Sequence, residues 1–145
     1  MIFQKRYRYR FGDIDHAGIA YYPALLHYFH VAFEDWWADG LGTPYPHLLN
    51  VEKLGLPSVH LDVDFVAPIR YGDEPEISLG VLRIGTSSVE FGMWMQVDGR
   101  DRANCKARIT TAAVDMDSLT GRPLPDRWRA EFEKWALDPA GWSDL

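Results

Sequence analysis

The sequence contains a single cysteine, Cys105, so no disulfide can form within the chain. It has no Cys-x-x-Cys pair and no cluster of cysteine with histidine, which are the patterns that indicate zinc. No run of about 18 apolar residues could span a membrane, and the first residues lack the apolar stretch of a signal peptide. We therefore expect a cytoplasmic protein with no membrane partner and no metal site.

Basic residues are outnumbered as well. The chain has 15 Lys and Arg against 21 Asp and Glu, which gives a formal net charge of -6. A surface that binds nucleic acid without specificity needs the opposite sign, so we expect no nucleic-acid partner. An anionic small substrate stays compatible with this balance, because a local group of arginines can oppose the overall charge.

Apolar residues, by contrast, are plentiful. They make up 47% of the 145 residues, and aromatic residues alone make up 14%. A chain of this length and composition can bury a sizeable core, and its length is typical of one domain. We predict a single domain over residues 1–145.

The first part of the chain predicts a strand, a loop and a long helix. Residues 3–11 alternate aromatic and basic side chains, which is the period of a strand with one wet face. Residues 12–20 are small, acidic or turn-forming. A helix is expected over residues 22–39, since Pro23 suits its first turn and Gly40 its end. Apolar residues recur along it at helical spacing: Leu25, Leu26, Phe29, Ala32, Phe33, Trp36 and Trp37.

The rest of the chain predicts a sheet that covers this helix. Such a broad apolar stripe favours a helix embraced by a sheet, so we expect an α+β arrangement with the sheet curled around it. A short helix is expected over residues 46–53 and a terminal helix from Pro125, with Trp128, Phe132 and Trp135 on one face. Alternating patterns predict four more strands, joined as a meander, over residues 59–65, 77–81, 89–97 and 103–114.

Two carboxylates, Asp13 and Asp15, lie just before the start of the long helix. The position expected to cap that helix is near Tyr22, whose side chain cannot reach back to do so. The backbone N–H groups of Tyr22, Ala24 and Leu25 are then expected to be free, and such a helix end favours a developing negative charge. Residue types alone leave two roles open for Asp15, a turn-forming one and a catalytic one.

The loop and helix start read FGDIDHAGIAYYP over residues 11–23. This segment resembles the signature loop of the 4-hydroxybenzoyl-CoA thioesterase family, whose pattern is FGD-x-D-x-AG-[IV]-x-[WY]-YP. Further resemblances lie downstream, and together they extend over about residues 3–114: Leu56-Pro57, the run from Asp64 to Pro68, Tyr71-Gly72-Asp73 and Gly85-x-Ser87-Ser88.

The resemblance implies a hot-dog fold whose subunits pair edge to edge into homodimers, which assemble into homotetramers with the active site at the dimer interface. It implies an acyl-CoA substrate that carries its own CoA, and no cofactor. Asp15 would be the catalytic carboxylate, acting as nucleophile or as general base. The N–H of Tyr22 would polarise the thioester carbonyl.

The same resemblance suggests an aromatic, benzoyl-like acyl group, since Tyr22-Pro23 is closer to the aryl-CoA branch of the family. The segment LPSVH over residues 56–60 also resembles the hydrolases of 1,4-dihydroxy-2-naphthoyl-CoA. Substrate contacts are then expected from His16, Gly18 and His60, although His60 could equally face solvent or another subunit. CoA contacts are expected from residues near strand ends: Arg83, Ser87 and Ser88, with Arg100 and Arg102 as further candidates.

Two other functions stay open at this point. A hot-dog hydratase or dehydratase would rely on a histidine, for which His16 is available. A non-catalytic module that binds acyl-CoA would need no carboxylate at position 15, so Asp15 argues against it.

Overall fold

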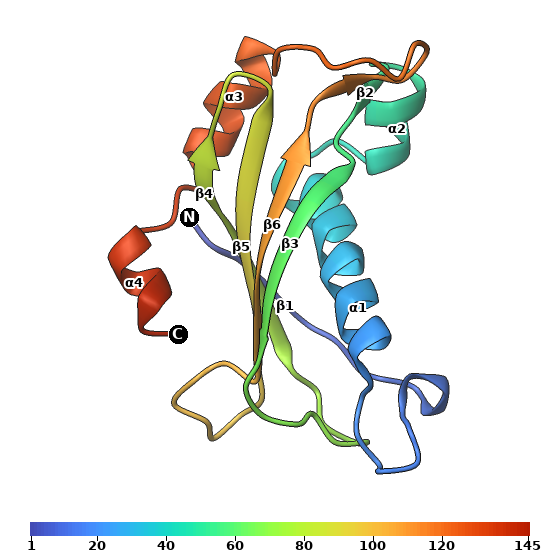
Figure 1. Ribbon diagram of the computed structural model, residues 1–145, viewed down its shortest axis with the longest axis vertical. Coiled ribbons are helices and arrows are strands. Elements are labelled where there is room, and N and C mark those ends of the chain that lie inside the picture. Colours follow the sequence, from blue (N-terminus) through green and yellow to red (C-terminus); the bar gives the residue numbers. More distant parts are fainter.

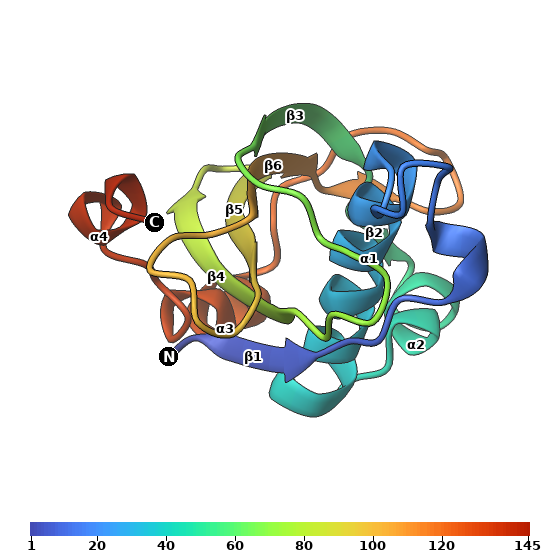
Figure 2. The ribbon, with the colours of Figure 1, turned by 90° about the horizontal axis from the view of Figure 1, so that it is seen from below.

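One curved antiparallel sheet carries the long helix α1 on its concave face, as Figure 1 and Figure 2 show. The computed structural model describes all 145 residues. The five strands lie in the order β1-β4-β5-β6-β3. This arrangement confirms the expected α+β hot-dog fold. The strands of the sheet are β1 Phe3–Arg6, β3 Ser58–Phe65, β4 Glu76–Ile84, β5 Ser88–Gln96 and β6 Cys105–Ala112.

The remaining elements surround this layer pair. Helix α3 lies near β4, and α4 lies on the side of the sheet away from α1 (Figure 2). A two-stranded ribbon of β2 and β7, which the sequence did not predict, closes the upper end. No helix combines the length and apolar character needed to cross a bilayer. The bounds are α1 Tyr22–Asp35, α2 Tyr45–Asn50, β2 Leu54–Gly55, β7 Val114–Asp115, α3 Asp126–Glu133 and α4 Pro139–Ser143.

The first strand is shorter than its alternating pattern predicts. β1 ends at Arg6, because Arg6 lies opposite Glu76, the first residue of its partner β4. Beyond that point only one further backbone hydrogen bond joins the two segments, from Tyr7 N–H to the Pro75 carbonyl over 3.1 Å. The chain continues as an extended segment whose tyrosines, Tyr7 and Tyr9, still turn into the core, and a single turn of 3-10 helix follows at Phe11–Asp13.

The long helix also ends earlier than predicted. Regular α geometry stops at Asp35, and one turn of π-helix, Trp36–Gly40, replaces the expected last turn. The helical path therefore still ends at Gly40, as predicted. A Cβ at Gly40 would lie 2.7 Å from Cδ1 of Trp36, so the close approach of the chain to this indole requires glycine.

The predicted four-strand meander is wrong for its first strand. β4, β5 and β6 do form a meander, but β3 pairs with β6 at the far edge of the sheet rather than with β4. The chain from β3 to β4 crosses the lower end of the molecule to reach the other side (Figure 2). Period-two patterns reveal strands but not their neighbours, which is why the sequence could not place β3.

The core is an aromatic contact between α1, the sheet and α3. The predicted stripe of the helix is buried except for Leu26, which is partly buried, and Phe29, Trp36 and Trp37 are at most 1% exposed. Phe33 meets Phe91 of β5 edge to face at a centroid distance of 5.3 Å. Such aromatic pairs add stabilisation beyond the area they bury. The position of α1 is therefore fixed along its whole length.

The outer edge strand β3 remains largely uncovered. The alternation in residues 59–65 predicts one buried face, but Val59, Leu61 and Phe65 are 61%, 46% and 55% exposed. β6 covers one edge of β3 only, and the opposite edge has no neighbouring strand. An edge that presents unpaired backbone groups and apolar side chains is a typical site for pairing with another chain.

Cys105 provides a simple test of the core. Burial, and secondarily the charge of Asp64, raise the pKa of the Cys105 thiol to about 12, and the residue is 1% exposed. At neutral pH the reactive thiolate is therefore scarce and shielded. We expect Ellman's reagent to detect no thiol in the folded chain and one after unfolding in guanidinium. Rapid stoichiometric labelling of the folded chain would contradict this packing.

Candidate active site

The loop that joins β1 to α1 lies at the lower end of the molecule, beside the start of the helix (Figure 1). A bridge between Ile14 and Ala20 closes this loop at its base. The loop is also tied to the segment that follows β3, since Ala20 N–H donates to the Ile69 carbonyl over 2.8 Å and Tyr71 N–H to that of Gly18 over 3.1 Å. Backbone contacts on both sides thus hold the loop in one position.

Asp13 anchors the loop to the helix. Its Oδ2 accepts hydrogen bonds from the backbone N–H of Arg10 over 2.8 Å and from the hydroxyl of Tyr28, on α1, over 2.9 Å. Its backbone carbonyl accepts from the Tyr21 N–H over 3.3 Å. Asp13 therefore has a structural role, and Tyr28 is a partner that the sequence did not reveal.

Only one oxygen of the Asp15 carboxylate accepts hydrogen bonds within the chain. Oδ1 accepts a hydrogen bond from Ala17 N–H over 2.8 Å and a longer one from Ile19 N–H over 3.4 Å, which forms an Asx-type turn. Oδ2 makes no hydrogen bond within the chain, and the residue is exposed. The two roles left open by the sequence are therefore compatible, because one oxygen orients the group and the other is available.

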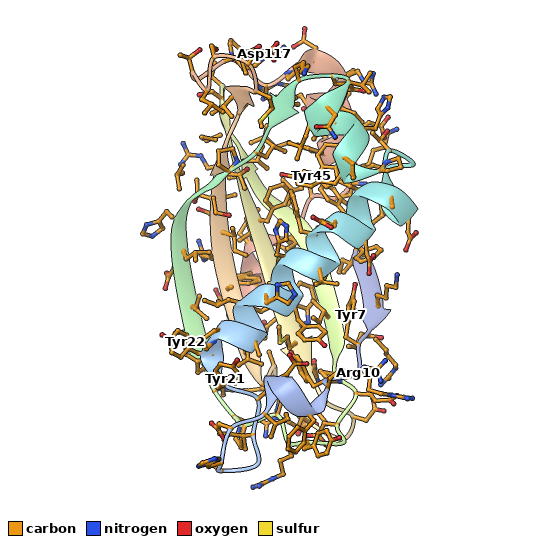
Figure 3. The ribbon with its side chains drawn as sticks, turned by 90° about the vertical axis from the view of Figure 1, so that its right-hand side faces the viewer. Tyr7, Arg10, Tyr21, Tyr22, Tyr45 and Asp117 are labelled. Atoms are coloured by element: carbon orange, nitrogen blue, oxygen red, sulfur yellow. The ribbon has the colours of Figure 1, made fainter.

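The start of α1 has one free amide rather than three. Tyr21 is the capping residue, and its carbonyl accepts from the N–H groups of Ala24 over 3.0 Å and Leu25 over 3.2 Å. The expectation that these two amides are free is therefore wrong, because the capping residue is Tyr21, one residue earlier than the predicted cap near Tyr22. The N–H of Tyr22 donates to no acceptor in the chain. Figure 3 shows Tyr21 and Tyr22 at the lower end of α1.

Asp15 and Tyr22 line the same hollow, of about 490 Å³, between the start of α1 and the end of β3. One wall is the ring of Phe65, whose centroid lies 6.5 Å from that of Tyr22. The sequence placed Phe65 only in a predicted strand, although the resemblance of residues 64–68 was a signal for this wall. Asp15 is the one charged residue of the lining. The remaining lining residues are Ile19, Ala20, Tyr21, Leu25, Val66, Ala67, Pro68 and Ile69.

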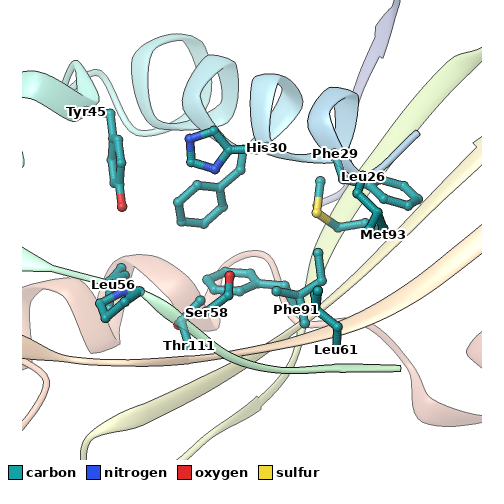
Figure 4. Close-up of a pocket in the computed structure, with 13 residues that line it drawn as sticks. Leu26, Phe29, His30, Tyr45, Leu56, Ser58, Leu61, Phe91, Met93 and Thr111 are labelled. Carbon is teal, nitrogen blue, oxygen red and sulfur yellow. The ribbon is translucent and has the colours of Figure 1, made fainter. Parts of the chain in front are cut away.

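The predicted substrate contacts are only partly brought together. His16 and Gly18 lie in the turn beside Asp15, but neither lines the hollow. Gly18 has φ of 77°, so the turn itself explains the glycine. His60 is exposed on β3 and does not line this hollow. It also does not line a second, apolar cavity that lies beneath the middle of α1 (Figure 4).

The predicted CoA contacts lie far from this hollow within one chain. Arg83 lies near the end of β4, Ser87 in the β4–β5 turn and Ser88 at the start of β5, all toward the upper end, whereas the Asp15 loop is at the lower end (Figure 1). Arg100 and Arg102 are in the β5–β6 loop, at the same end as Asp15. No group of three or more His, Cys, Asp or Glu side chains is arranged to hold a metal ion.

Known proteins share this sequence and this arrangement. A family model described as the thioesterase-like superfamily matches residues 9–135. The 1,4-dihydroxy-2-naphthoyl-CoA hydrolase of Prochlorococcus marinus is 32% identical over 129 residues, which cover 82% of this chain and 81% of that protein. A protein of the same name from Synechocystis is 29% identical over 123 residues, with 81% and 85% covered.

Solved structures agree with this fold. A thioesterase superfamily protein from Jannaschia, 28% identical, superposes with a TM-score of 0.87 over 94% of each chain. The 1,4-dihydroxy-2-naphthoyl-CoA thioesterase of Synechocystis shares the fold with a TM-score of 0.80 at 21% identity, over 91% of this chain and 96% of that one. Because the family model and the relatives match over most of the length, the chain belongs to the thioesterase-like superfamily.

Proposed function

We propose that this protein hydrolyses an aromatic acyl-CoA thioester to the free acid and CoA. One observation carries the proposal: Asp15 and Tyr22 line the same hollow. One oxygen of the Asp15 carboxylate is free of hydrogen bonds within the chain, and so is the N–H of Tyr22 at the start of α1. A carboxylate of this kind can start the reaction, and such an amide favours the oxyanion that develops.

The chemistry follows from these two groups. The free oxygen of Asp15 attacks the thioester carbonyl, CoA leaves as its thiolate, and water hydrolyses the resulting mixed anhydride. Alternatively, Asp15 takes a proton from a water molecule that attacks the carbonyl directly. In both versions the Tyr22 N–H donates to the carbonyl oxygen as it gains charge. Neither version routes a step through a metal or a cofactor.

Two observations support an aromatic acyl group. Relatives of this chain are named as hydrolases of 1,4-dihydroxy-2-naphthoyl-CoA, an aryl thioester. The hollow that holds Asp15 is apolar, with an aromatic wall from Phe65. The narrower likeness to 4-hydroxybenzoyl-CoA thioesterases points to the same class of acyl group.

We also propose that β3 pairs with β3 of a second copy. The outer edge of β3 is free, and Val59 and Leu61 on this strand are exposed. Across a twofold axis, the same edge of a second copy can supply the missing backbone hydrogen bonds and apolar contacts. Such pairing would run the two β3 strands antiparallel and place the upper end of one subunit beside the lower end of the other. The CoA contacts proposed for Arg83, Ser87 and Ser88 would then come from the partner. Stacking of such dimers would give the proposed homotetramer.

Replacing Asp15 by Asn tests the hydrolase. The amide oxygen of asparagine can still accept from Ala17 N–H, so the turn should persist while the acid–base and nucleophilic functions are lost. We expect thiol release from benzoyl-CoA to fall by about 10²–10⁴-fold, with the melting temperature and substrate binding retained. The unreactive Cys105 should leave the background of the thiol assay flat.

The control for this variant is Asp115→Asn, in a similar turn at β7, where Asp115 Oδ1 accepts from Asp117 N–H over 3.0 Å. It should retain full turnover. A folded Asp15→Asn protein with normal turnover would refute the hydrolase. Conversion of an enoyl-CoA without thiol release would favour the hydratase instead.

Tyr28→Phe tests whether the anchor through Asp13 positions the loop. The variant keeps the ring, which packs on Tyr9 at 4.3 Å, and removes the hydroxyl that Asp13 accepts. We expect kcat to fall several-fold with little change in KM, and a loss of about 1 kcal/mol in the free energy of unfolding.

Tyr7→Phe is the matched control, because it removes a similar hydroxyl that donates to Asp35 over 2.7 Å, away from the loop. A comparable loss of stability with unchanged kcat is expected there. Equal kcat in both variants would show that Tyr28 only stabilises the fold.

Val59→Glu tests the proposed dimer. A carboxylate on this exposed edge residue would be buried in the interface between the two β3 strands and should shift the protein from dimer to monomer in light scattering. Val51→Glu adds the same charge at a valine that is 65% exposed but lies outside β3, and it should leave the mass unchanged. A wild-type monomer at high concentration, or a Val59→Glu dimer, would contradict this pairing.

A further inference from the structure

The end of the chain lies on the convex face of the sheet, which has no part in the chemistry described so far. Figure 1 and Figure 2 show α4 on this side, with α1 on the other. Trp142 is only 6% exposed there, although α4 is a helix of five residues. A helix this short is not stable by itself, so contacts with the sheet hold it in place.

Two glycines form a socket for this segment. Gly80 of β4 and Gly92 of β5 lie directly opposite each other, and their neighbours along each strand are buried on the α1 side. The convex face is therefore bare at this point, because successive side chains of a strand alternate between its two faces. A Cβ at Gly80 would overlap the side chain of Leu137, and one at Gly92 would lie 2.7 Å from Cζ3 of Trp142. Glycine inside a strand marks such a close approach.

Backbone hydrogen bonds guide the chain into this socket. β1 covers the edge of β4 only as far as Leu79. Beyond it, Val81 N–H donates to the Trp135 carbonyl over 2.8 Å, and the Val81 carbonyl accepts from Leu137 N–H over 2.8 Å. The chain thus extends the edge of the sheet and then turns onto its convex face. We call residues 137–145 the C-terminal cap.

The ring of Trp142 is held from several sides. It meets the ring of Trp94, on β5, edge to face at a centroid distance of 6.1 Å. Nζ of Lys106 and Cζ of Arg108 each lie 5.7 Å from its centroid, which is within the range of a cation–π interaction. Trp94 is only 7% exposed as a result, and Ala103 beside it is fully buried. The cap therefore covers the apolar centre of the convex face.

The part of the convex face that the cap leaves open carries two rows of opposite charge. Asp62 and Asp64 of β3 lie opposite Arg108 and Lys106 of β6. These side chains border a hollow of about 290 Å³ next to Trp142. A second copy turned by 180° could lay its acidic row on the basic row of the first. Without the cap, this strip and the exposed Trp94 would together form a surface suited to association.

We propose that the C-terminal cap prevents the convex face of the sheet from pairing with the same face of a second copy. Trp142 fills the position that side chains of the second copy would otherwise take. Dimers formed through β3 then cannot stack sheet to sheet, so the proposed homotetramer would stack on the α1 side. This role goes beyond the proposed hydrolase, because no residue of the cap lines the hollow at Asp15.

Trp142→Lys in the full chain tests the cap. The new ammonium group would lie beside Lys106 and Arg108, and its repulsion should release the cap from the sheet. We expect the molar mass in light scattering at least to double relative to wild type at equal concentration, because two assemblies join into one. Thiol release from benzoyl-CoA per chain should not change, since the Asp15 hollow lies on the other side of the sheet.

Gly92→Val displaces the cap from the opposite direction, by filling the socket with a residue that suits a strand. It should give the same increase in mass, and it decides the question if Trp142→Lys fails to fold. Trp142→Phe is the matched control, because its apolar ring still fits the socket. Its mass should equal that of wild type. Melting curves establish that each variant is folded.

A second substitution identifies the surface that associates. Trp94→Lys, added to Trp142→Lys, places a charge at the centre of the uncovered face and should return the mass to that of wild type. A folded Trp142→Lys or Gly92→Val with wild-type mass would overturn the proposal. An increase that survives Trp94→Lys would also reject it, because another surface would then be responsible. Absence of thiol release by wild type would refute the hydrolase alone and leave these outcomes intact.

Discussion

The contact between α1 and the sheet is the interaction on which the rest of the molecule depends. Phe33 and Trp36 of this helical segment pack against Phe91 of the sheet at centroid distances of 5.3 Å and 5.5 Å, and Trp36 also meets Phe132 of α3 at 5.3 Å. Contacts of this kind fix the rotation and position of the helix. The free amide at its first residue, Tyr22, is therefore held by packing many residues away.

The Asp15 loop shows how one side chain meets a structural and a chemical requirement together. A carboxylate has two oxygens, and the turn needs only Oδ1, which accepts from Ala17 N–H. The second oxygen is then oriented without being consumed. Asp13 differs in this respect, because its Oδ2 is shared by Arg10 N–H and the Tyr28 hydroxyl. Two neighbouring aspartates thus acquire different roles from the donors around them.

The hollow that holds Asp15 lies between the start of α1 and the end of β3, the strand whose outer edge is unpaired. In the isolated chain Asp15 is exposed, and so are the apolar side chains of Leu61 and Phe65 on the strand wall. A second copy on this edge would cover that wall and lower the dielectric around Asp15, which strengthens the electrostatic effects of the site. Pairing and activity would then be coupled in this protein.

The sequence by itself located the five strands of the main sheet and the central helix, because spacing along the chain records which side chains can share a face. It also placed Asp15 before a helix start without a capping side chain, and it singled out the aromatic stripe that forms the core. These features depend on residues close together in the chain.

Only the tertiary structure decided where β3 pairs, which amide stays free and which residues line the hollow at Asp15. The early end of β1 follows from where β4 begins, and the loss of two predicted free amides follows from the carbonyl of Tyr21. The ring of Tyr45, on α2, packs against His30, and no local pattern connects these two residues. Each of these outcomes depends on partners far away in sequence, and a hydrogen-bonding group is free or occupied only once those partners are in place.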